Sequence, residues 1–253
     1  MKTILEAKEL NKIYGSNQQT VILKNINLEI LEGEFVSVMG PSGSGKSTLL
    51  YNISGMDKMT AGKVILDGKD VSALSQKDLS RLRLNEMGFI FQQIHLLKNL
   101  SIFDNIILSA YLAKKESRKK INKRAMELMS NTGIEHLADN DITKASGGQL
   151  QRVAICRALI NNPKIIFGDE PTGALNSKSA GEVMEILADI NEMGTTILLV
   201  THDIKVAAQT ERVIYMLDGE IIGEKRLGKY KKENNEIKDR EVILSEWLSN
   251  LDF

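Results

Sequence analysis

A glycine-rich run after residue 39 has the residue types and the order that a phosphate-binding loop requires. It follows the apolar segment Phe35–Met39, matches the pattern G-x-x-x-x-G-K-S/T, and consists of Gly40, Pro41, Ser42, Gly43, Ser44, Gly45, Lys46, Ser47 and Thr48. Glycines let the chain curl so that successive backbone N–H groups point at one phosphate. Lys46 would contact the β- and γ-phosphates, and the Ser47 hydroxyl could ligate Mg²⁺. Since a chance match is expected on the order of once in a hundred such chains, the run predicts a nucleoside triphosphate site.

Two acids follow a second apolar segment that is typical of a buried strand. Asp169 and Glu170 come after Ile165–Phe167 and Gly168. Asp169 at the strand tip could hold Mg²⁺, directly or through water, and Glu170 could act as general base on an attacking water. Many strands end in acids simply for solubility, so this pair alone decides little. Together with the phosphate loop it predicts hydrolysis of the nucleotide.

A histidine follows the next apolar segment in the same way. His202 comes two residues after the buried-strand pattern Thr196–Val200. Neighbouring parallel strands end at the same edge of a sheet, where ligands of open α/β folds bind. The position predicts that His202 contacts the γ-phosphate and orients the attacking water, with an ordinary structural histidine as the alternative.

A short glycine motif precedes an amphipathic helix pattern later in the chain. The motif consists of Ser146, Gly147, Gly148 and Gln149. Ser146 and Gln149 predict a capping box, and the glycines leave the N-terminus of the helix accessible to an anion. A well-capped helix without a ligand is the alternative.

In chain order, the phosphate loop, the Ser-Gly-Gly-Gln motif and the Asp169–Glu170 pair about twenty residues after it resemble the motifs of the ABC (ATP-binding cassette) ATPases. The resemblance covers about residues 3–225. It implies a composite site, in which the phosphate loop of one subunit closes on the Ser-Gly-Gly-Gln motif of a second copy around two ATPs. The roles that it implies are adenine stacking for Tyr14, a Mg²⁺- and water-sensing glutamine for Gln92, Mg²⁺ binding for Asp169, the base for Glu170 and the switch histidine for His202. From the residues alone, Tyr14 would be an ordinary loop aromatic and Gln92 would indicate nothing.

Within that family, the segments Gly88–Gln93 and Glu170–Leu175 resemble the branch of macrolide-export, lipoprotein-release, cell-division and bacitracin-export ATPases. The branch implies an integral-membrane permease on a separate chain, and export of an antimicrobial peptide or a macrolide. Ile94, Leu96 and Leu97 could line a groove that receives a permease helix. Local core packing is the alternative for these three residues.

Two positions depart from the family pattern. Ala145 stands where the family usually has Leu, which trims packing beneath the Ser-Gly-Gly-Gln helix. Asn176 stands where an Asp usually helps to couple the two sites of the dimer; it keeps the size and one acceptor but loses the charge. Asn176 therefore leaves open a different class of function, a nucleotide-gated regulatory ATPase that signals to a membrane partner without transport.

The elements that must position these residues alternate between strands and helices, which predicts an α/β fold. The resemblance makes it a P-loop NTPase, with a RecA-like core, an N-terminal antiparallel β subdomain and an inserted helical subdomain. We expect the β subdomain and core at 1–92 and 163–225, the helical subdomain at 93–162, and a charged tail at 226–253. Short separate strands are expected at Val21–Leu23 and around Ile26, Leu28 and Ile30.

The tail ends in apolar residues that are spaced as one helical face: Val242, Ile243, Leu244, Trp247, Leu248 and Leu251. This spacing predicts a helix docked on the body of the protein. A partner-binding helix is the alternative.

Composition excludes several other classes. In 253 residues, 33 basic side chains balance 33 acidic ones, so no net charge favours a nucleic acid partner. The basic stretch Lys114–Arg124 is expected to be a solvated helix face rather than a lipid- or nucleotide-binding patch. The single cysteine, Cys156, excludes an internal disulfide and a cysteine metal cluster, and its helical context predicts a buried small residue rather than a reactive thiol.

The apolar segments are short. No run approaches the roughly 20 residues that span a bilayer, and the first residues lack a signal-peptide core. We therefore expect a peripheral protein at the cytoplasmic face of the membrane, held there by a partner.

Overall fold

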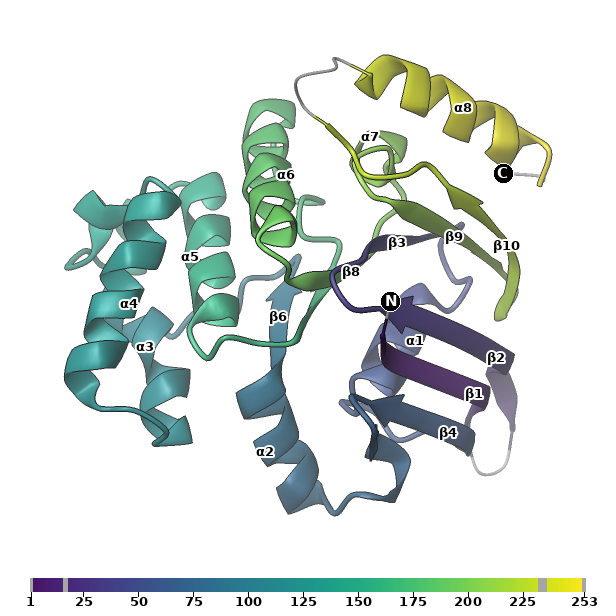
Figure 1. The fold of residues 1–253 in the computed structure, drawn as a ribbon, viewed down its shortest axis with the longest axis horizontal. Helices are drawn as coiled ribbons and strands as arrows, with labels where there is room; N and C mark the ends of the chain where they lie inside the picture. The colour runs from purple at the N-terminus through teal and green to yellow at the C-terminus, as the bar shows by residue number, and fades with distance from the viewer. Residues whose placement is uncertain (1, 16–17, 232–235, 252–253) are drawn as a thin grey trace. The chain divides into compact units, whose positions relative to one another are not determined.

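The computed structural model describes residues 2–15, 18–231 and 236–251 (Figure 1). They fall into two compact units: residues 1–79 with 191–253, and residues 80–190. Helix α2 (Gln76–Glu86) and helix α6 (Ser177–Glu192) each cross a boundary between the units along the chain. The finer division into a core and a helical subdomain at 93–162 stays a prediction.

The first unit contains an antiparallel sheet with the strand order β2-β1-β4-β5. Its strands are β1 (Thr3–Tyr14), β2 (Thr20–Leu31), β4 (Ala61–Leu66) and β5 (Lys69–Asp70). The expectation of two short strands within residues 21–30 is wrong, because β2 runs unbroken through both. Glu9 and Asn25 each have a φ of 48°, and the β1–β2 register shifts after Ala7 and again after Leu10. These bulges interrupt the alternation of side chains without ending the strand.

The same unit contains parallel strands that carry the nucleotide motifs. Strand β3 (Phe35–Met39) pairs in parallel with β8 (Thr196–Val200) and with β9 (Arg212–Leu217), and β10 (Glu220–Arg226) pairs antiparallel to β9. Every residue of β3 and β8 is buried. For β8 this confirms the buried-strand prediction. Helix α1 (Lys46–Ile53) follows β3, the 3₁₀ turn η1 (Val71–Ala73) follows β5, and α7 (Ile204–Ala207) follows β8.

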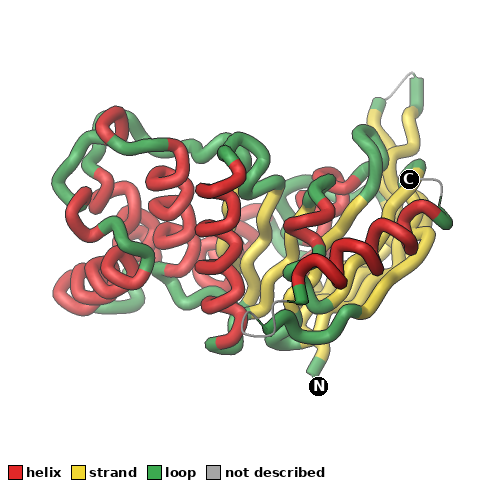
Figure 2. Tube along the Cα trace, turned by 90° about the horizontal axis from the view of Figure 1, so that it is seen from above, coloured by secondary structure: helices red, strands yellow, loops and turns green. Residues whose placement is uncertain are grey.

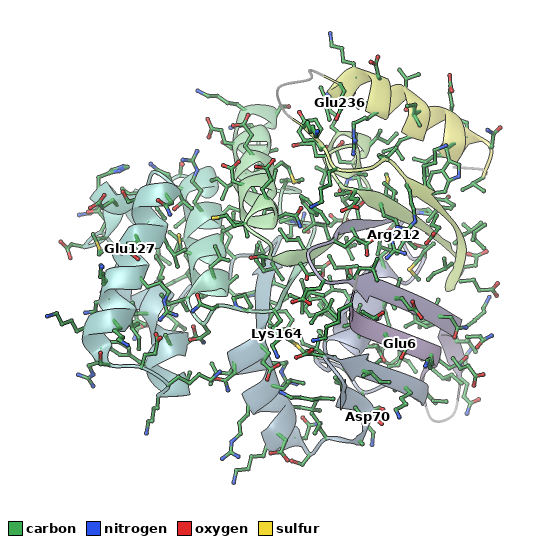
Figure 3. The ribbon with its side chains drawn as sticks, in the orientation of Figure 1. Glu6, Asp70, Glu127, Lys164, Arg212 and Glu236 are labelled. Atoms are coloured by element: carbon green, nitrogen blue, oxygen red, sulfur yellow. The ribbon has the colours of Figure 1, made fainter. Side chains whose placement is uncertain are left out.

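A buried ion pair ties this set of strands together. Arg212 is 5% exposed, and its guanidinium lies 2.8 Å from a carboxylate oxygen of Glu34. A second guanidinium nitrogen lies 3.0 Å from Glu224 on β10 (Figure 3). Removing one partner of such a pair would leave a buried charge unpaired, which typically costs about 3–5 kcal/mol.

The C-terminal helix α8 (Ile237–Ser249) docks on this unit beside α7 and β9 (Figure 1). Leu244 and Leu248 are buried in a cluster with Tyr215. The buried Arg240 donates hydrogen bonds to the carbonyls of Ala208 (2.6 Å), Thr210 (2.7 Å), Leu227 (3.1 Å) and Gly228 (2.9 Å). The contacts agree with the docked-helix prediction.

Of the six apolar residues that were expected to form one helical face, Leu251 lies beyond the end of α8, and two of the other five do not share its buried face. Val242 is 55% exposed and Ile243 is 42% exposed. Arg240, Leu244 and Leu248 recur at intervals of four, so they occupy one side of the helix. Residues 242 and 243 fall on other sides, and the expectation that all six form one face is wrong for them.

The second unit contains one pair of parallel strands and a group of helices that pack against one another (Figure 2). Strand β6 (Met87–Phe91) lies parallel to β7 (Ile165–Asp169). Helices α3 (Ile102–Ala113), α4 (Arg118–Asn131) and α5 (Gly147–Leu159) enclose an apolar cluster that includes Ile106, Met129 and Cys156. The 3₁₀ turns η2 (Glu135–Leu137) and η3 (Ile142–Lys144) join α4 to α5.

Cys156 is the buried small residue that its context predicts. Its thiol is fully buried, 3.2 Å from the Thr132 hydroxyl. Burial raises the pKa of the thiol to about 12, so the reactive thiolate form is not populated near neutral pH.

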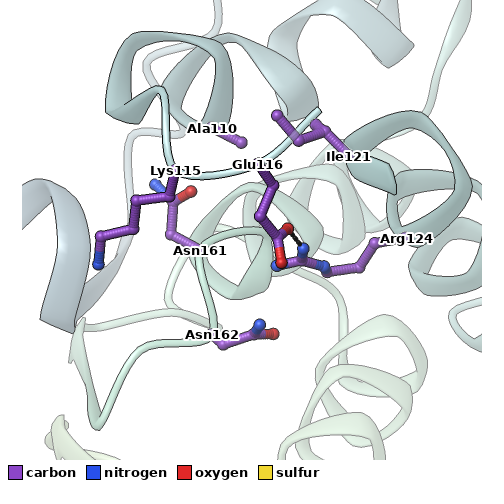
Figure 4. Close-up of a pocket in the computed structure, with 7 residues that line it drawn as sticks. All are labelled: Ala110, Lys115, Glu116, Ile121, Arg124, Asn161 and Asn162. Carbon is purple, nitrogen blue, oxygen red and sulfur yellow. Dashed lines mark ion pairs between the residues drawn. The ribbon is translucent and has the colours of Figure 1, made fainter. Parts of the chain in front are cut away.

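The basic stretch Lys114–Arg124, which runs into the first half of α4, is mostly exposed to solvent, as expected. Its half-buried Arg124 pairs with Glu116 and donates a hydrogen bond of 2.9 Å to the carbonyl of Ile160. The pair lines a pocket of about 200 Å³ whose other lining residues are Ala110, Lys115, Ile121, Asn161 and Asn162 (Figure 4). The contacts of Arg124 therefore fasten α4 to the end of α5.

Within the described chain, no helix combines the length and the apolar character that a membrane span needs.

Candidate nucleotide site

The phosphate loop joins β3 to α1 with backbone angles that only glycine adopts readily. Gly40 has a φ of 151°, and a Cβ atom there would lie 2.1 Å from the carbonyl oxygen of Met216. Gly45 has a φ of 98°, and its Cβ would lie 3.0 Å from the carbonyl oxygen of Ile22. The loop can therefore curl this closely against β2 and β9 only because these two positions lack side chains.

Lys46 places a positive charge inside the curl. The side chain is 7% exposed, and its ammonium donates to the carbonyls of Gly40 (2.9 Å) and Pro41 (2.7 Å). Lys46 is also the first residue of α1, whose N-cap Gly45 provides no side-chain cap. The ammonium and the positive end of the helix dipole therefore lie in one loop. Such a concavity suits a polyphosphate.

The hydroxyl of Ser44 supplies a test of fit for a phosphate. Its oxygen is buried and has no hydrogen-bond partner among the described residues. A buried hydroxyl without a partner is costly. It lies beside Gly40, where a Cβ would come within 2.7 Å of it. A phosphate oxygen in the curl would accept this hydrogen bond. Ser47 and Thr48, in the first turn of α1, are half-buried.

Two more predicted site residues belong to the same unit. Tyr14 ends β1 with its ring 44% exposed. His202 is exposed and lies between β8 and α7, where the side chain of Asp203 caps α7 by accepting a hydrogen bond from the Lys205 amide at 2.8 Å. The phosphate loop, Tyr14 and His202 thus form the part of the predicted set that lies in residues 1–79 and 191–253.

The second unit brings Gln92, Asp169 and Glu170 together. The backbone N–H of Gln92 donates a hydrogen bond of 2.9 Å to the backbone carbonyl of Asp169. A Cβ at Gly173 would lie 2.9 Å from the Gln92 amide nitrogen and 3.2 Å from a Glu170 carboxylate oxygen. The two side chains therefore converge over Gly173, and a larger residue there would displace the end of the Gln92 side chain. Sequence reasoning gave Gly173 no role, although it lies within the quoted segment Glu170–Leu175.

Glu170 has an unusual backbone for its residue type. Its φ is 47°, in the left-handed region. A non-glycine residue held there costs of order 1–3 kcal/mol and persists where the surrounding structure requires it. Glu170 directly follows β7, and one of its carboxylate oxygens lies beside Gly173.

The Ser-Gly-Gly-Gln motif forms the predicted capping box. The Gln149 amide donates to the Ser146 hydroxyl at 3.3 Å, and the Ser146 amide donates to the Gln149 side-chain oxygen at 2.8 Å. Ser146 and Gly147 are exposed. A Cβ at Gly148 would lie 2.9 Å from the Ser179 hydroxyl, so the second glycine permits close packing against α6.

The two departures from the family pattern have structural explanations. Ala145 is half-buried against the apolar cluster of α3, α4 and α5. Asn176 precedes α6, and its side-chain oxygen accepts a hydrogen bond from the Ser179 amide at 2.9 Å. This is a helix N-cap, a position for which Asn and Asp are equally suited. The fold therefore does not need the missing charge.

The segment after Gln92 divides between core and surface. Leu96 packs against the apolar cluster, Ile94 is half-buried and Leu97 is 48% exposed. The core-packing alternative is therefore correct for Leu96, while Leu97 remains available to a partner.

Two residues that sequence reasoning missed hold this segment in place. Arg157 donates to the carbonyls of His95 (2.8 Å) and Ile94 (2.9 Å). Asn105 accepts from the Leu97 amide at 2.8 Å and donates to the Leu97 carbonyl at 3.1 Å. Arg157 lies on α5, 62 positions after His95, and Asn105 lies on α3, eight positions after Leu97. No local motif marks either residue.

The donors fit Mg²⁺ bound through its substrate. No group of three His, Cys, Asp or Glu side chains that could hold a metal occurs among the residues that the structure describes. Mg²⁺ is commonly held by one or two protein oxygens together with substrate phosphates. Ser47 in the first unit, and Asp169 and Gln92 in the second, each carry a side-chain oxygen of the kind that this ion prefers.

Known proteins share this sequence and fold. The family model described as ABC transporter matches residues 23–173. An ABC transporter ATP-binding protein of Methanocaldococcus jannaschii, MJ1508, is 46% identical over 220 residues, which cover 87% of this chain and 98% of the relative. The macrolide export ATP-binding/permease protein MacB of Escherichia coli is 44% identical over 88% of this chain, which spans only 35% of MacB.

A solved structure extends the likeness to the whole fold. The ATP-binding cassette MJ0796, described as dimeric, in a post-hydrolysis state and bound to ADP and Pi, superposes with a TM-score of 0.82. It is 42% identical, and the match covers 89% of this chain and 100% of that one. The chain therefore belongs to the ABC transporter family, in the branch that includes MacB, and is an ATP-binding and ATP-hydrolysing cassette with the P-loop NTPase fold.

Proposed function

We propose that this cassette is the motor subunit of a membrane transporter, and that two copies close around two ATPs to drive a permease from the cytoplasmic face. The observation that carries the proposal is a pair of helix N-termini in one chain, each of which lies at a glycine-rich motif. Helix α1 begins at a glycine-built loop around Lys46, and α5 begins at the exposed Ser146 and Gly147. Two copies placed head to tail would each offer α1 to a nucleotide and α5 to the nucleotide of the other. The dimeric state of MJ0796 supports this arrangement.

Each predicted residue has a role in that cycle. The amides of Gly43–Thr48, the Ser44 hydroxyl and Lys46 hold the β- and γ-phosphates, His202 contacts the γ-phosphate, and Tyr14 stacks on adenine. Ser47 supplies one oxygen ligand to Mg²⁺, and in the second unit Asp169 and Gln92 supply others. Bound Mg²⁺ would neutralise charge on the phosphates. Glu170 accepts a proton from the attacking water.

The γ-phosphate explains why turnover would drive motion. A ligand shifts an equilibrium only by its difference in affinity for the two states. Only the closed dimer contacts the γ-phosphate from both copies, through Lys46 of one and Ser146 of the other. Hydrolysis removes that contact, and the dimer opens.

The Glu170→Gln variant tests this cycle. The amide cannot take the proton, so we expect ATP hydrolysis to fall roughly a hundredfold or more, while ATP binding persists and a dimer accumulates with ATP on size-exclusion chromatography. The matched control is Glu127→Gln on the exposed face of α4 (Figure 3), which should hydrolyse ATP normally and form no stable dimer. Normal hydrolysis by Glu170→Gln would assign the base to another residue; a slow variant that stays monomeric with ATP would refute the closure.

The exposed Leu97 is the residue that we propose contacts the permease. The Leu97→Asp variant, carrying an affinity tag, should lose the permease from detergent-solubilised membranes while it retains ATP binding. Leu112→Asp is the matched control, since Leu112 is 63% exposed on α3 of the same unit. Equal recovery of the permease with both variants would remove Leu97 from the interface.

The similarity to MacB, a macrolide export protein, supports a macrolide as the transported class. An antimicrobial peptide is the other class that the sequence predicts. A nucleotide-gated regulatory ATPase would use the same residues. Phosphate release from the cassette, measured alone and with its permease, separates the two: a motor accelerates with the permease and the transported molecule, whereas a regulator turns over slowly in both.

A further inference from the structure

Three side chains of the first unit form a connected group around the ring of Tyr14. One carboxylate oxygen of Asp57 accepts a hydrogen bond from the Lys12 ammonium at 2.9 Å, and the other accepts one from the Tyr14 hydroxyl. The Lys12 ammonium also donates 2.6 Å to the carbonyl of Lys58 and lies 4.4 Å from the centroid of the Tyr14 ring. Asp57 therefore fixes one end of the ring and Lys12 covers one of its faces.

The group is anchored to the helix that follows the phosphate loop. Asp57 lies just beyond the end of α1, and its amide donates 3.0 Å to the carbonyl of Tyr51 in the last turn. Asn52 donates 2.8 Å to the Thr48 carbonyl and lies 3.5 Å from the Asp57 carboxylate. The orientation of the Tyr14 ring is thus set by α1, the same helix whose first residue is Lys46.

Lys12 is unusual for a strand lysine. It is 7% exposed, although most lysines keep the ammonium in water. Its position over the ring and its bond to Asp57 account for that burial, since a buried charge requires a partner and hydrogen bonds. With one face of Tyr14 covered by Lys12, a planar base can stack only on the other.

We propose that Lys12 and Asp57 are positioning residues that hold the Tyr14 ring, at a fixed angle to α1, for stacking on the adenine of ATP. This rests on the proposed role of Tyr14. A ring that is already held loses less rotational freedom when a ligand binds, so the fixed geometry contributes to affinity for the base. The phosphates are held by the loop and gain nothing from it.

The hydrogen bond from the Tyr14 hydroxyl to the Asp57 carboxylate also changes the acidity of the hydroxyl. Because the carboxylate accepts this bond, the pKa of Tyr14 is raised to about 12. Removing the hydroxyl with Tyr14→Phe keeps the ring but breaks its bond to Asp57. The Asp57→Asn substitution removes the charge that holds both partners. If the bond acts through the orientation of the ring, the two substitutions should have similar effects on nucleotide affinity.

The test compares Mg·ATP with Mg·tripolyphosphate, which offers the phosphates without a base. Calorimetry of the full chain should show that Tyr14→Ala weakens ATP by roughly tenfold to a hundredfold, the range of base–aromatic stacking. Asp57→Asn and Tyr14→Phe should each weaken it by roughly threefold to tenfold, the cost of ordering one side chain. Tripolyphosphate affinity should be unchanged in all three variants. The Asp57→Asn and Tyr14→Phe effects should also not add in the double variant, because both remove one bond.

The matched control is Glu6→Gln. Glu6 pairs with Lys8 on the same strand at 2.8 Å, without an aromatic ring (Figure 3), so its removal should leave both affinities unchanged. If Tyr14→Ala alone weakens ATP while Asp57→Asn and Tyr14→Phe bind as the wild type does, the positioning inference is wrong and stacking survives. If Tyr14→Ala binds ATP normally, stacking itself is wrong. A loss of tripolyphosphate affinity in Asp57→Asn would assign Asp57 to the phosphate loop instead.

Discussion

Two helices of this protein begin at glycine-rich motifs, but their first turns are completed in different ways. Helix α1 begins after Gly45, which is in a left-handed conformation and provides no side-chain cap. Helix α5 begins after Ser146, whose side chain and that of Gln149 cap each other's backbone. A side-chain cap typically contributes about 1 kcal/mol. The first turn of α1 therefore lacks a stabilising group that a bound phosphate can supply.

The difference indicates how each motif is used. The loop before α1 has a buried lysine, a buried serine hydroxyl without a partner, and backbone angles that require glycine, so it is organised around a ligand. The start of α5 is stable by itself and is exposed. A motif that needs no ligand to fold, and that stays exposed, is suited to contact a nucleotide presented by a second copy.

The largest expected effect comes from adding one methyl group to each motif. Gly40→Ala places a Cβ atom 2.1 Å from a backbone oxygen at a φ of 151°, so the loop must move. We expect Mg·ATP binding to be lost in calorimetry. In Gly147→Ala the Cβ would meet only the end of Leu175, at 3.6 Å. That variant should bind ATP as a monomer and fail only in forming the ATP-dependent dimer.

Either variant can contradict the proposed difference between the two motifs. Normal ATP affinity in Gly40→Ala would mean that the loop tolerates a different backbone. Lost ATP affinity in Gly147→Ala, with an unchanged melting temperature, would mean that α5 serves the nucleotide of its own chain.

The sequence predicted most reliably the features that depend on neighbouring residues. The phosphate loop, the capping box at Ser146, the strand β3 and the buried strand β8 follow from patterns within a few residues. The bulges at Glu9 and Asn25 were not predicted, because the register of β1 against β2 is set by pairing between two strands and not by either strand alone.

The remaining site features depend on residues that are distant in the chain. Gln92 and Glu170 converge at Gly173 only through the pairing of β6 with β7. Asp57 reaches Tyr14 across 43 positions of sequence, and no local pattern marks that contact. Leu96 and Leu97 are adjacent and chemically alike, yet one packs in the core and the other is exposed. Only the packing of α3, α4 and α5 distinguishes them.

A smaller effect is expected from removing the cap of α5. Ser146→Ala should lower the free energy of unfolding by about 1 kcal/mol in urea titration, and should also abolish the ATP-dependent dimer, because the hydroxyl is lost. Ser117→Ala is the matched control, since Ser117 caps α4 in the same unit by accepting from the Lys120 amide at 3.4 Å. It should lose comparable stability and dimerise normally. If both variants dimerise equally well, Ser146 acts only as a cap.

The smallest effect is expected at Asn176, where the family pattern has Asp. Asn176→Asp keeps the cap of α6, because its carboxylate can accept from the Ser179 amide as the present side chain does. The added charge at a helix N-terminus should stabilise the protein by about 0.3–1 kcal/mol. The helix end favours the charged form, which lowers the pKa of the new carboxyl in the folded state. The gain is therefore present above about pH 4, the ordinary pKa of Asp, and is lost as the pH falls through the lowered value. Since the cap is unchanged, we expect ATP affinity to stay the same and phosphate release to rise by no more than roughly threefold, about 0.65 kcal/mol of barrier. A rise of tenfold or more would show that the missing charge, and not the shape of the turn before α6, limits turnover.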